Sequence, residues 1–92
     1  MTLENNTLLI GQKPVMNYVL VGLTHLQGES DTLIIKARGR CISSAVDVSQ
    51  ILTRKFAKDV SIKGVKLDTE TLVNKITSRD NRVSSIEITL QK

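Results

Sequence analysis

The sequence predicts a mixed fold of helices and strands in the order β-α-β-α-β-β. Three observations support this prediction. In each half of the first sixty residues, a short strand-like apolar run is followed by apolar residues at helical spacing. The last third contains two β-rich segments joined by a polar stretch. We therefore expect the first two strands to be parallel, with helical crossovers, and the last two to form an antiparallel hairpin.

The first strand and helix lie between Thr7 and Gly28. The run "TLLI" ends at Gly11 and is typical of a short buried strand. Pro14 suits the first position of a helix because it lacks an N–H and has a fixed φ, and Gly28 suits the C-terminal end. Apolar residues cover a wide arc of this helix, so we expect it to pack against a sheet and a partner chain.

The second strand and helix begin at Thr32. Over Thr32–Arg38, Leu33, Ile35 and Ala37 alternate with more polar positions, which predicts one buried strand face. From Arg40 the apolar residues recur at helical intervals up to about "KFAKD".

The last two strands are predicted to form a long hairpin arm. In "VSIKGVKL" the apolar parity changes after Gly64, which predicts a β-bulge that restores one buried face. The segment "RVSSIEITL" shows a similar change of parity, which predicts a second slip at Ser84 and Ser85. Between them, "ETLVNKITSRDNR" extends the strands into an arm whose exposed cations are Lys75, Arg79 and Arg82.

Composition indicates a single domain over residues 1–92. With 40% hydrophobic residues, a chain of 92 residues has a small core, so we expect it to form a dimer. The formal charge of +4 identifies a nucleic-acid binder only if the cations gather on one face. Cys41, the single cysteine, suits a reducing compartment, and we find no signal peptide or membrane-spanning segment. We expect a cytoplasmic protein that does not enter membranes.

The two junctions between strand and helix have similar sequences. "LLIGQKPVM" and "IIKARGRCI" both pass from an apolar strand through glycine and a cation into a helix. Parallel strands end at the same edge of a sheet, so Lys13 should lie near Arg38 and Arg40. Helix N-termini and cations together bind phosphate oxygens. The alternative is that these cations are ordinary solvated turn residues, and the pattern alone leaves both interpretations open.

Enzymatic motifs are not found. The loop after Gly11 lacks the second glycine and the Ser or Thr of a nucleotide-binding P-loop. His25 is the only histidine, so it cannot form a nucleophile pair with Cys41 and a second histidine. The carboxylates lack the spacing of metal ligands. We therefore expect no catalytic residue, no metal and no cofactor.

Nucleic-acid recognition by base stacking is also disfavoured. Tyr18 and Phe56 are the only aromatic residues, whereas single-strand binders line a surface with several. Recognition of the phosphate backbone and of duplex shape remains. Phe56 lies among cations in "RKF", and its partial exposure would indicate a protein contact or else the edge of the core.

The sequence resembles the Alba family of archaeal chromatin proteins from Leu8 to Lys92. The resemblance rests on "IGQKPVMNYV", "IKARGRCISSAVDVSQIL" and "RVSSIEITLQK". It implies an α+β domain, a β-α-β-α-β-β two-layer sandwich similar to the C-terminal domain of translation initiation factor three, with an extended β-hairpin arm. It also implies a homodimer whose arms reach along the minor groove while the body covers the backbone.

The resemblance implies roles for particular residues. Lys13 matches the family's principal nucleic-acid contact, and Arg38 and Arg40 match cations beside it. Phe56 matches an aromatic at a contact between dimers. The remaining implied nucleic-acid-binding residues are Gln12, Asn17 and Tyr18 around the first loop and Arg79 and Arg82 at the arm tip.

One departure from the family pattern occurs at Gln12. Many members have a second lysine there, which is an acetylation target, and glutamine resembles the acetylated form. We expect no regulation by acetylation at this position and a somewhat lower affinity.

The implied function is non-enzymatic, largely sequence-independent binding of double-stranded DNA, which coats, compacts or bridges the chromosome. The alternative is RNA binding, in RNA stabilisation or with ribonuclease P. A third, different class is a protein assembly domain that binds no nucleic acid. Expected partners are double-stranded DNA, RNA, a second copy of the chain with higher-order assembly on DNA, and a paralogue in a heterodimer.

Overall fold

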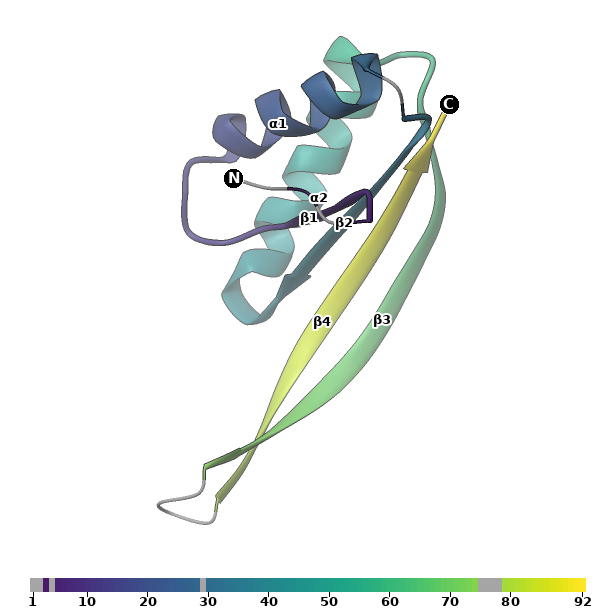
Figure 1. Cartoon of the computed structure of the whole chain (residues 1–92). Coiled ribbons are helices and arrows are strands. Elements are labelled where there is room, and N and C mark those ends of the chain that lie inside the picture. The colour runs from purple at the N-terminus through teal and green to yellow at the C-terminus, as the bar shows by residue number, and fades with distance from the viewer. Residues whose placement is uncertain (1–2, 4, 29, 75–78) are drawn as a thin grey trace.

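The chain folds into two layers, with two helices packed on one face of a four-stranded sheet (Figure 1). The computed structural model describes residues 3, 5–28, 30–74 and 79–92. The sheet order is β1-β2-β4-β3, with β1 parallel to β2 and the other pairs antiparallel. The main elements are β1 (Thr7–Leu9), α1 (Val15–Gln27), β2 (Thr32–Arg38), α2 (Ile42–Ile51), β3 (Ser61–Asn74) and β4 (Arg79–Gln91). The predicted order of elements, the parallel pair and the α+β class are confirmed.

The helix α1 begins and ends beside the residues that the sequence indicated. Pro14 lies immediately before the first helical residue, with φ −55° and ψ 143°, and its carbonyl accepts a 3.0 Å hydrogen bond from Asn17 N. Gly28 follows the last helical residue. These two residues set the length of the helix that covers β2.

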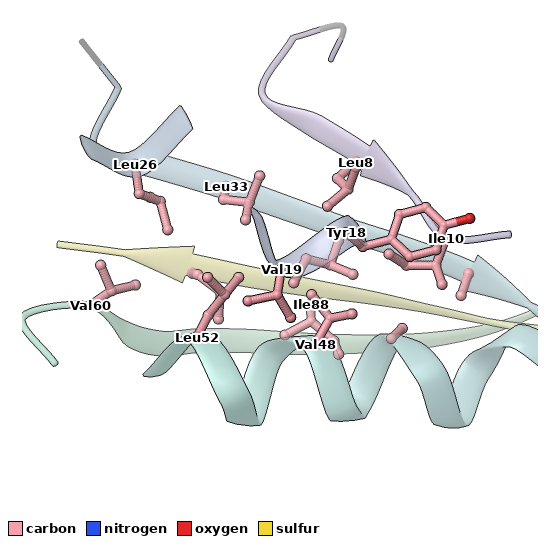
Figure 2. Packing of buried hydrophobic residues seen from close by; sticks show 14 of the residues in the cluster. Leu8, Ile10, Tyr18, Val19, Leu26, Leu33, Val48, Leu52, Val60 and Ile88 are labelled. Atoms are coloured by element: carbon pink, nitrogen blue, oxygen red, sulfur yellow. The ribbon is translucent and has the colours of Figure 1, made fainter. Parts of the chain in front are cut away.

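The core lies between the helices and the inner face of the sheet (Figure 2). On β2, Leu33, Ile35 and Ala37 are buried, as their alternation predicted. Buried residues of α1 and α2 pack against this face, because their apolar positions recur at helical spacing. The largest fully buried side chains are Leu8, Leu26, Leu33, Ile35, Leu52, Leu90, Val19, Val48 and Ser49.

The second helix ends in a wider turn. After α2, residues Leu52–Phe56 form a π turn (η2), in which Ala57 N donates to the carbonyl of Leu52 at 2.6 Å. Leu52 points into the core, whereas Phe56 is 48% exposed. The exposed Phe56 agrees with the surface position that its neighbouring cations indicated.

The bulge predicted at Gly64 is confirmed. Ile62 pairs with Leu90 and Gly64 with Thr89, so the register shifts between them. Beyond this shift, Val65 and Leu67 pair with buried residues of β4 and so share the inner face of the sheet. The chain itself does not bury these two side chains, because β3 is the edge strand and the helices pack mainly on β2 and β4. Val65 is 55% and Leu67 73% exposed.

The slip predicted at Ser84 and Ser85 was wrong. The pairing of β3 with β4 runs without a break from Gly64–Thr89 to Asn74–Arg79. Val83 therefore lies on the outer face, where its Cγ1 would be 3.5 Å from a Cβ added to Gly39. An apolar residue occupies this outer-face position because it lies against the turn after β2, and not because the strand changes register.

The hairpin continues well beyond the body of the molecule (Figure 1). The last residue pair between β2 and β4 is Arg38–Ser85, and β3 and β4 pair only with each other farther out. The molecule measures 47 × 23 × 22 Å as a result. Within the described residues, neither helix has the length and apolar character that crossing a membrane requires.

Candidate nucleic-acid interface

The loop between β1 and α1 is held from inside by Tyr18. The Tyr18 hydroxyl accepts hydrogen bonds from the backbone N–H groups of Gly11, at 2.9 Å, and Lys13, at 3.2 Å. A Cβ on Gly11 would lie only 3.1 Å from that hydroxyl oxygen, so the close approach favours glycine. The side chains of Gln12 and Lys13 are left exposed to solvent.

Tyr18 itself faces the core and not the solvent. It is 4% exposed, it belongs to the same buried cluster as Ile10, and its hydroxyl already accepts the two loop amides (Figure 2). The expected direct contact with nucleic acid does not fit this position, because the side chain has almost no surface to offer. Asn17 is exposed in the first turn of α1, beside the loop that Tyr18 holds.

The junction between β2 and α2 exposes two arginines on either side of a glycine. Arg38 is the last residue of β2 and its side chain is exposed on the face away from the helices. Gly39 has a φ of 59°, in the left-handed region, and begins the short 3₁₀ turn η1 (Gly39–Cys41). Arg40 is exposed within this turn. The glycine reverses the chain tightly enough for both cations to remain at the end of the strand.

The two loops leave the sheet at the same edge. Leu9 pairs with Lys36 in the parallel ladder, and Ile10 N donates to the carbonyl of Lys36 at 2.8 Å. The chain therefore leaves β1 alongside β2, two residues before Arg38. Neither α1 nor α2 has an acidic residue in its first turn or a side-chain cap at its N-terminus. Exposed cations and uncapped helix N–H groups on one edge make a region that favours anions.

One of these cations forms a salt bridge with a residue of the same chain. Arg38 Nη1 donates to Glu70 Oε2 on β3 at 2.9 Å. The sequence analysis did not single out Glu70, because residues 32 positions apart come together only through the sheet order and the hairpin register. The alternation on β3 would have placed Glu70 on the outer face, but it could not have identified Arg38 as its partner.

Of the three cations predicted for the arm, the structure describes the side chain of one. Arg82 is exposed and pairs with Thr71 in the ladder. The structure describes only the backbone of Arg79, which pairs with Asn74 of β3. Lys75 lies outside the described residues.

No alternative catalytic or metal site is found in the described part of the chain. No group of three or more His, Cys, Asp or Glu side chains lies close enough to hold a metal ion among these residues. His25 Nε2 is 3.0 Å from the side-chain oxygen of Asn6, and Cys41 is a half-buried free thiol. These interactions fit structural roles.

Comparison with known proteins places the chain in a family. The family model described as Alba matches residues 6–80. The chain belongs to the Alba family. It is 48% identical over 89 residues to the DNA/RNA-binding protein Alba of Thermoplasma acidophilum, which covers 97% of this chain and 98% of that protein. It is 43% identical over 90 residues to the DNA/RNA-binding protein Alba 1 of Archaeoglobus fulgidus, with 98% and 99% covered.

Solved structures agree with the Alba fold. Alba from Thermoplasma volcanium superposes with a TM-score of 0.85 at 45% identity, covering 94% of this chain and 99% of the other. ALBA1 from Trypanosoma brucei has a TM-score of 0.73 at 21% identity, covering 99% and 72%, and supports the fold alone. The Alba relatives are named as binding proteins, and the expectation that this Alba chain is not an enzyme is confirmed by membership of that family.

Proposed function

We propose that this chain is a dimeric protein that binds double-stranded DNA largely without regard to sequence and thereby coats or bridges the chromosome. One observation carries the proposal. Lys13, Arg38 and Arg40 are exposed where the chain leaves two neighbouring parallel strands, and the helices that follow have no acidic residue in the first turn and no side-chain cap. Relatives at 48% and 43% identity are named DNA/RNA-binding proteins, which supports the same ligand class.

The chemistry of this edge favours phosphate. The Lys13 ammonium is a compact charge on a loop held by Tyr18, and the arginines offer planar donor groups suited to phosphate oxygens. Gln12 and Asn17 add neutral donors beside Lys13. Contacts of this kind position a protein on the duplex but carry no base information, so binding is expected to be largely independent of sequence.

The hairpin arm provides a second region of contact. Its strands extend past the last pair with β2, and a strand advances about 3.3 Å per residue. The six residue steps from Asp68 to Asn74 therefore reach about 20 Å from the body. We propose that Arg79 and Arg82 on this arm contact the backbone along a groove.

A second copy of the chain is the proposed partner for the inner face of β3. Ile62, Val65 and Leu67 continue the apolar surface of β4 onto an edge strand that the helices leave open. An edge strand with unpaired backbone groups and exposed apolar side chains favours association with another chain. For Phe56, 48% exposed on the π turn after α2, we propose a contact between dimers on DNA.

RNA is the alternative ligand, and the names of the relatives support it equally. Phe56 is the one exposed aromatic side chain, because Tyr18 is buried and the chain has no other Phe, Tyr or Trp, whereas proteins that stack unpaired bases use several aromatic residues. This favours duplexes over single strands. It does not separate duplex DNA from duplex RNA, whose phosphates offer the same chemistry to these cations.

The test is charge reversal at Lys13 with a matched control. We expect Lys13→Glu to weaken binding to two unrelated DNA duplexes equally, by about tenfold or more near 0.1 M salt, and to reduce the salt slope by about one unit for each lost contact. Lys58→Glu makes the same charge change at an exposed turn before β3, at the opposite end of the sheet from Arg38. It should have a much smaller effect.

Both variants are measured with DNA duplexes, an RNA duplex and single-stranded RNA, after size-exclusion chromatography has established that the dimer is intact. Equal effects of Lys13→Glu and Lys58→Glu would contradict the proposed edge. Wild-type binding to RNA that is tighter than to DNA at the same salt would favour the RNA alternative, and no binding to either would favour an assembly domain.

A further inference from the structure

The Arg38 side chain is already engaged within the free chain. Its Nη1 lies 2.9 Å from Glu70 Oε2, the one salt bridge found among the described side chains. The two side chains are 61% and 46% exposed, so the pair lies on the surface where a ligand can reach it.

The pair spans a strand that lies between its two members. Arg38 is on β2 and Glu70 is on β3, and β4 separates these strands in the sheet. Arg38 is in register with Ser85 of β4, and Ser85 is in register with Asp68 of β3. Two strand spacings amount to about 10 Å. Glu70 itself is in register with Val83, so the two long side chains meet diagonally across the outer face of β4, over Ser85 and Val83.

The pair also connects the arm to the body. Arg38–Ser85 is the last residue pair of the ladder between β2 and β4, whereas Glu70 is two residues beyond Asp68 on the free part of the hairpin. A ligand that takes Arg38 from Glu70 therefore removes a contact between the root of the arm and the end of β2.

Carboxylate and phosphate oxygens compete for the same donors. A guanidinium group binds either through its N–H groups, and a phosphate at Arg38 would lie next to the negative charge of Glu70. An exposed pair of this kind contributes little to stability, so a phosphate of a charged polymer can displace it.

Resting on the function proposed above, we propose that Glu70 is an intramolecular competitor for the nucleic-acid phosphate at Arg38. Glu70 lowers the affinity of the free chain and is displaced when Arg38 engages the backbone. It acts on binding through Arg38, because it occupies the guanidinium group in the free chain, and makes no favourable contact with nucleic acid itself.

The experiment compares Glu70→Gln with Asp68→Asn. Asp68 lies on the same strand and face, two residues away, and its Oδ1 accepts the N–H of Thr69 at 2.8 Å. Both substitutions remove one negative charge from an exposed position. Each is made in the wild-type chain and in an Arg38→Gln background, and affinity for one DNA duplex is measured over a series of salt concentrations.

We expect Glu70→Gln to tighten binding about threefold or more at ~0.05 M salt and to steepen the salt slope by up to about one unit per subunit. Asp68→Asn should give a smaller gain from the general change of charge. In the Arg38→Gln background the two substitutions should have equal effects, because the competition at Arg38 no longer exists.

The proposal is overturned if Glu70→Gln gains no more than Asp68→Asn, or if its advantage persists without Arg38. A loss of affinity in Glu70→Gln would also overturn it, since Glu70 would then hold Arg38 in a productive position. These outcomes leave the proposed function standing as long as the wild-type chain binds DNA. Failure of the wild type to bind any nucleic acid overturns both proposals.

Discussion

Replacing Tyr18 with phenylalanine removes the single oxygen atom that holds the loop carrying Lys13. The ring remains, so its packing in the buried cluster is kept and the loss is confined to two hydrogen bonds, at 2.9 Å and 3.2 Å. A hydrogen bond contributes about 0.5–1.5 kcal/mol net. Water can replace the bond to the exposed Lys13 amide more readily than the bond to the half-buried Gly11 amide. We therefore expect a loss of about 1–2 kcal/mol in the free energy of unfolding.

Urea unfolding at a fixed protein concentration measures this loss, and amide hydrogen exchange locates it. The Gly11 amide should be protected in the wild type and should exchange much faster in Tyr18→Phe, whereas core amides such as that of Ile35 should change only by the global loss of stability. DNA affinity should fall several-fold at temperatures where the variant is fully folded, because the loop is less ordered. Unchanged stability together with unchanged exchange at Gly11 would refute the role assigned to the Tyr18 hydroxyl.

Two further substitutions test the loops. Gly39→Ala places a side chain at φ 59° and should cost about 1 kcal/mol, whereas Gly39→Asn should be better tolerated because asparagine adopts this conformation more readily; equal melting temperatures for the two variants would contradict the argument. Gln12→Lys should raise DNA affinity and steepen the salt slope by about one unit per added contact, and an affinity and slope identical to the wild type would show that Gln12 lies away from the phosphates.

Local features of the sequence were sufficient to predict the elements of the fold. The change from alternation to helical spacing, together with Pro14 and Gly28, indicated both helices and the parallel strands, because each of these signals acts within a few residues. The parity change at Gly64 predicted the bulge for the same reason. The parity change at Val83 was misread as a slip, since the sequence does not reveal that Val83 meets the turn at Gly39.

The candidate site was predicted in part. Its exposed cations lie within two residues of a glycine at the ends of strands, and these positions are readable from residue order alone. Tyr18 was identified near the loop, but its burial and the direction of its hydroxyl depend on packing between α1 and β1. Its role therefore changed from a proposed contact to a support for the loop.

The sequence was enough to determine where Lys13, Arg38 and Arg40 stand relative to strand ends, because strand and helix periodicity are properties of neighbouring residues. Only the tertiary structure decided which of these cations is paired. Glu70 reaches Arg38 across β4 because of the sheet order and the register of two ladders. Each of these depends on contacts between residues far apart in the chain, and no local pattern in the sequence encodes their combination.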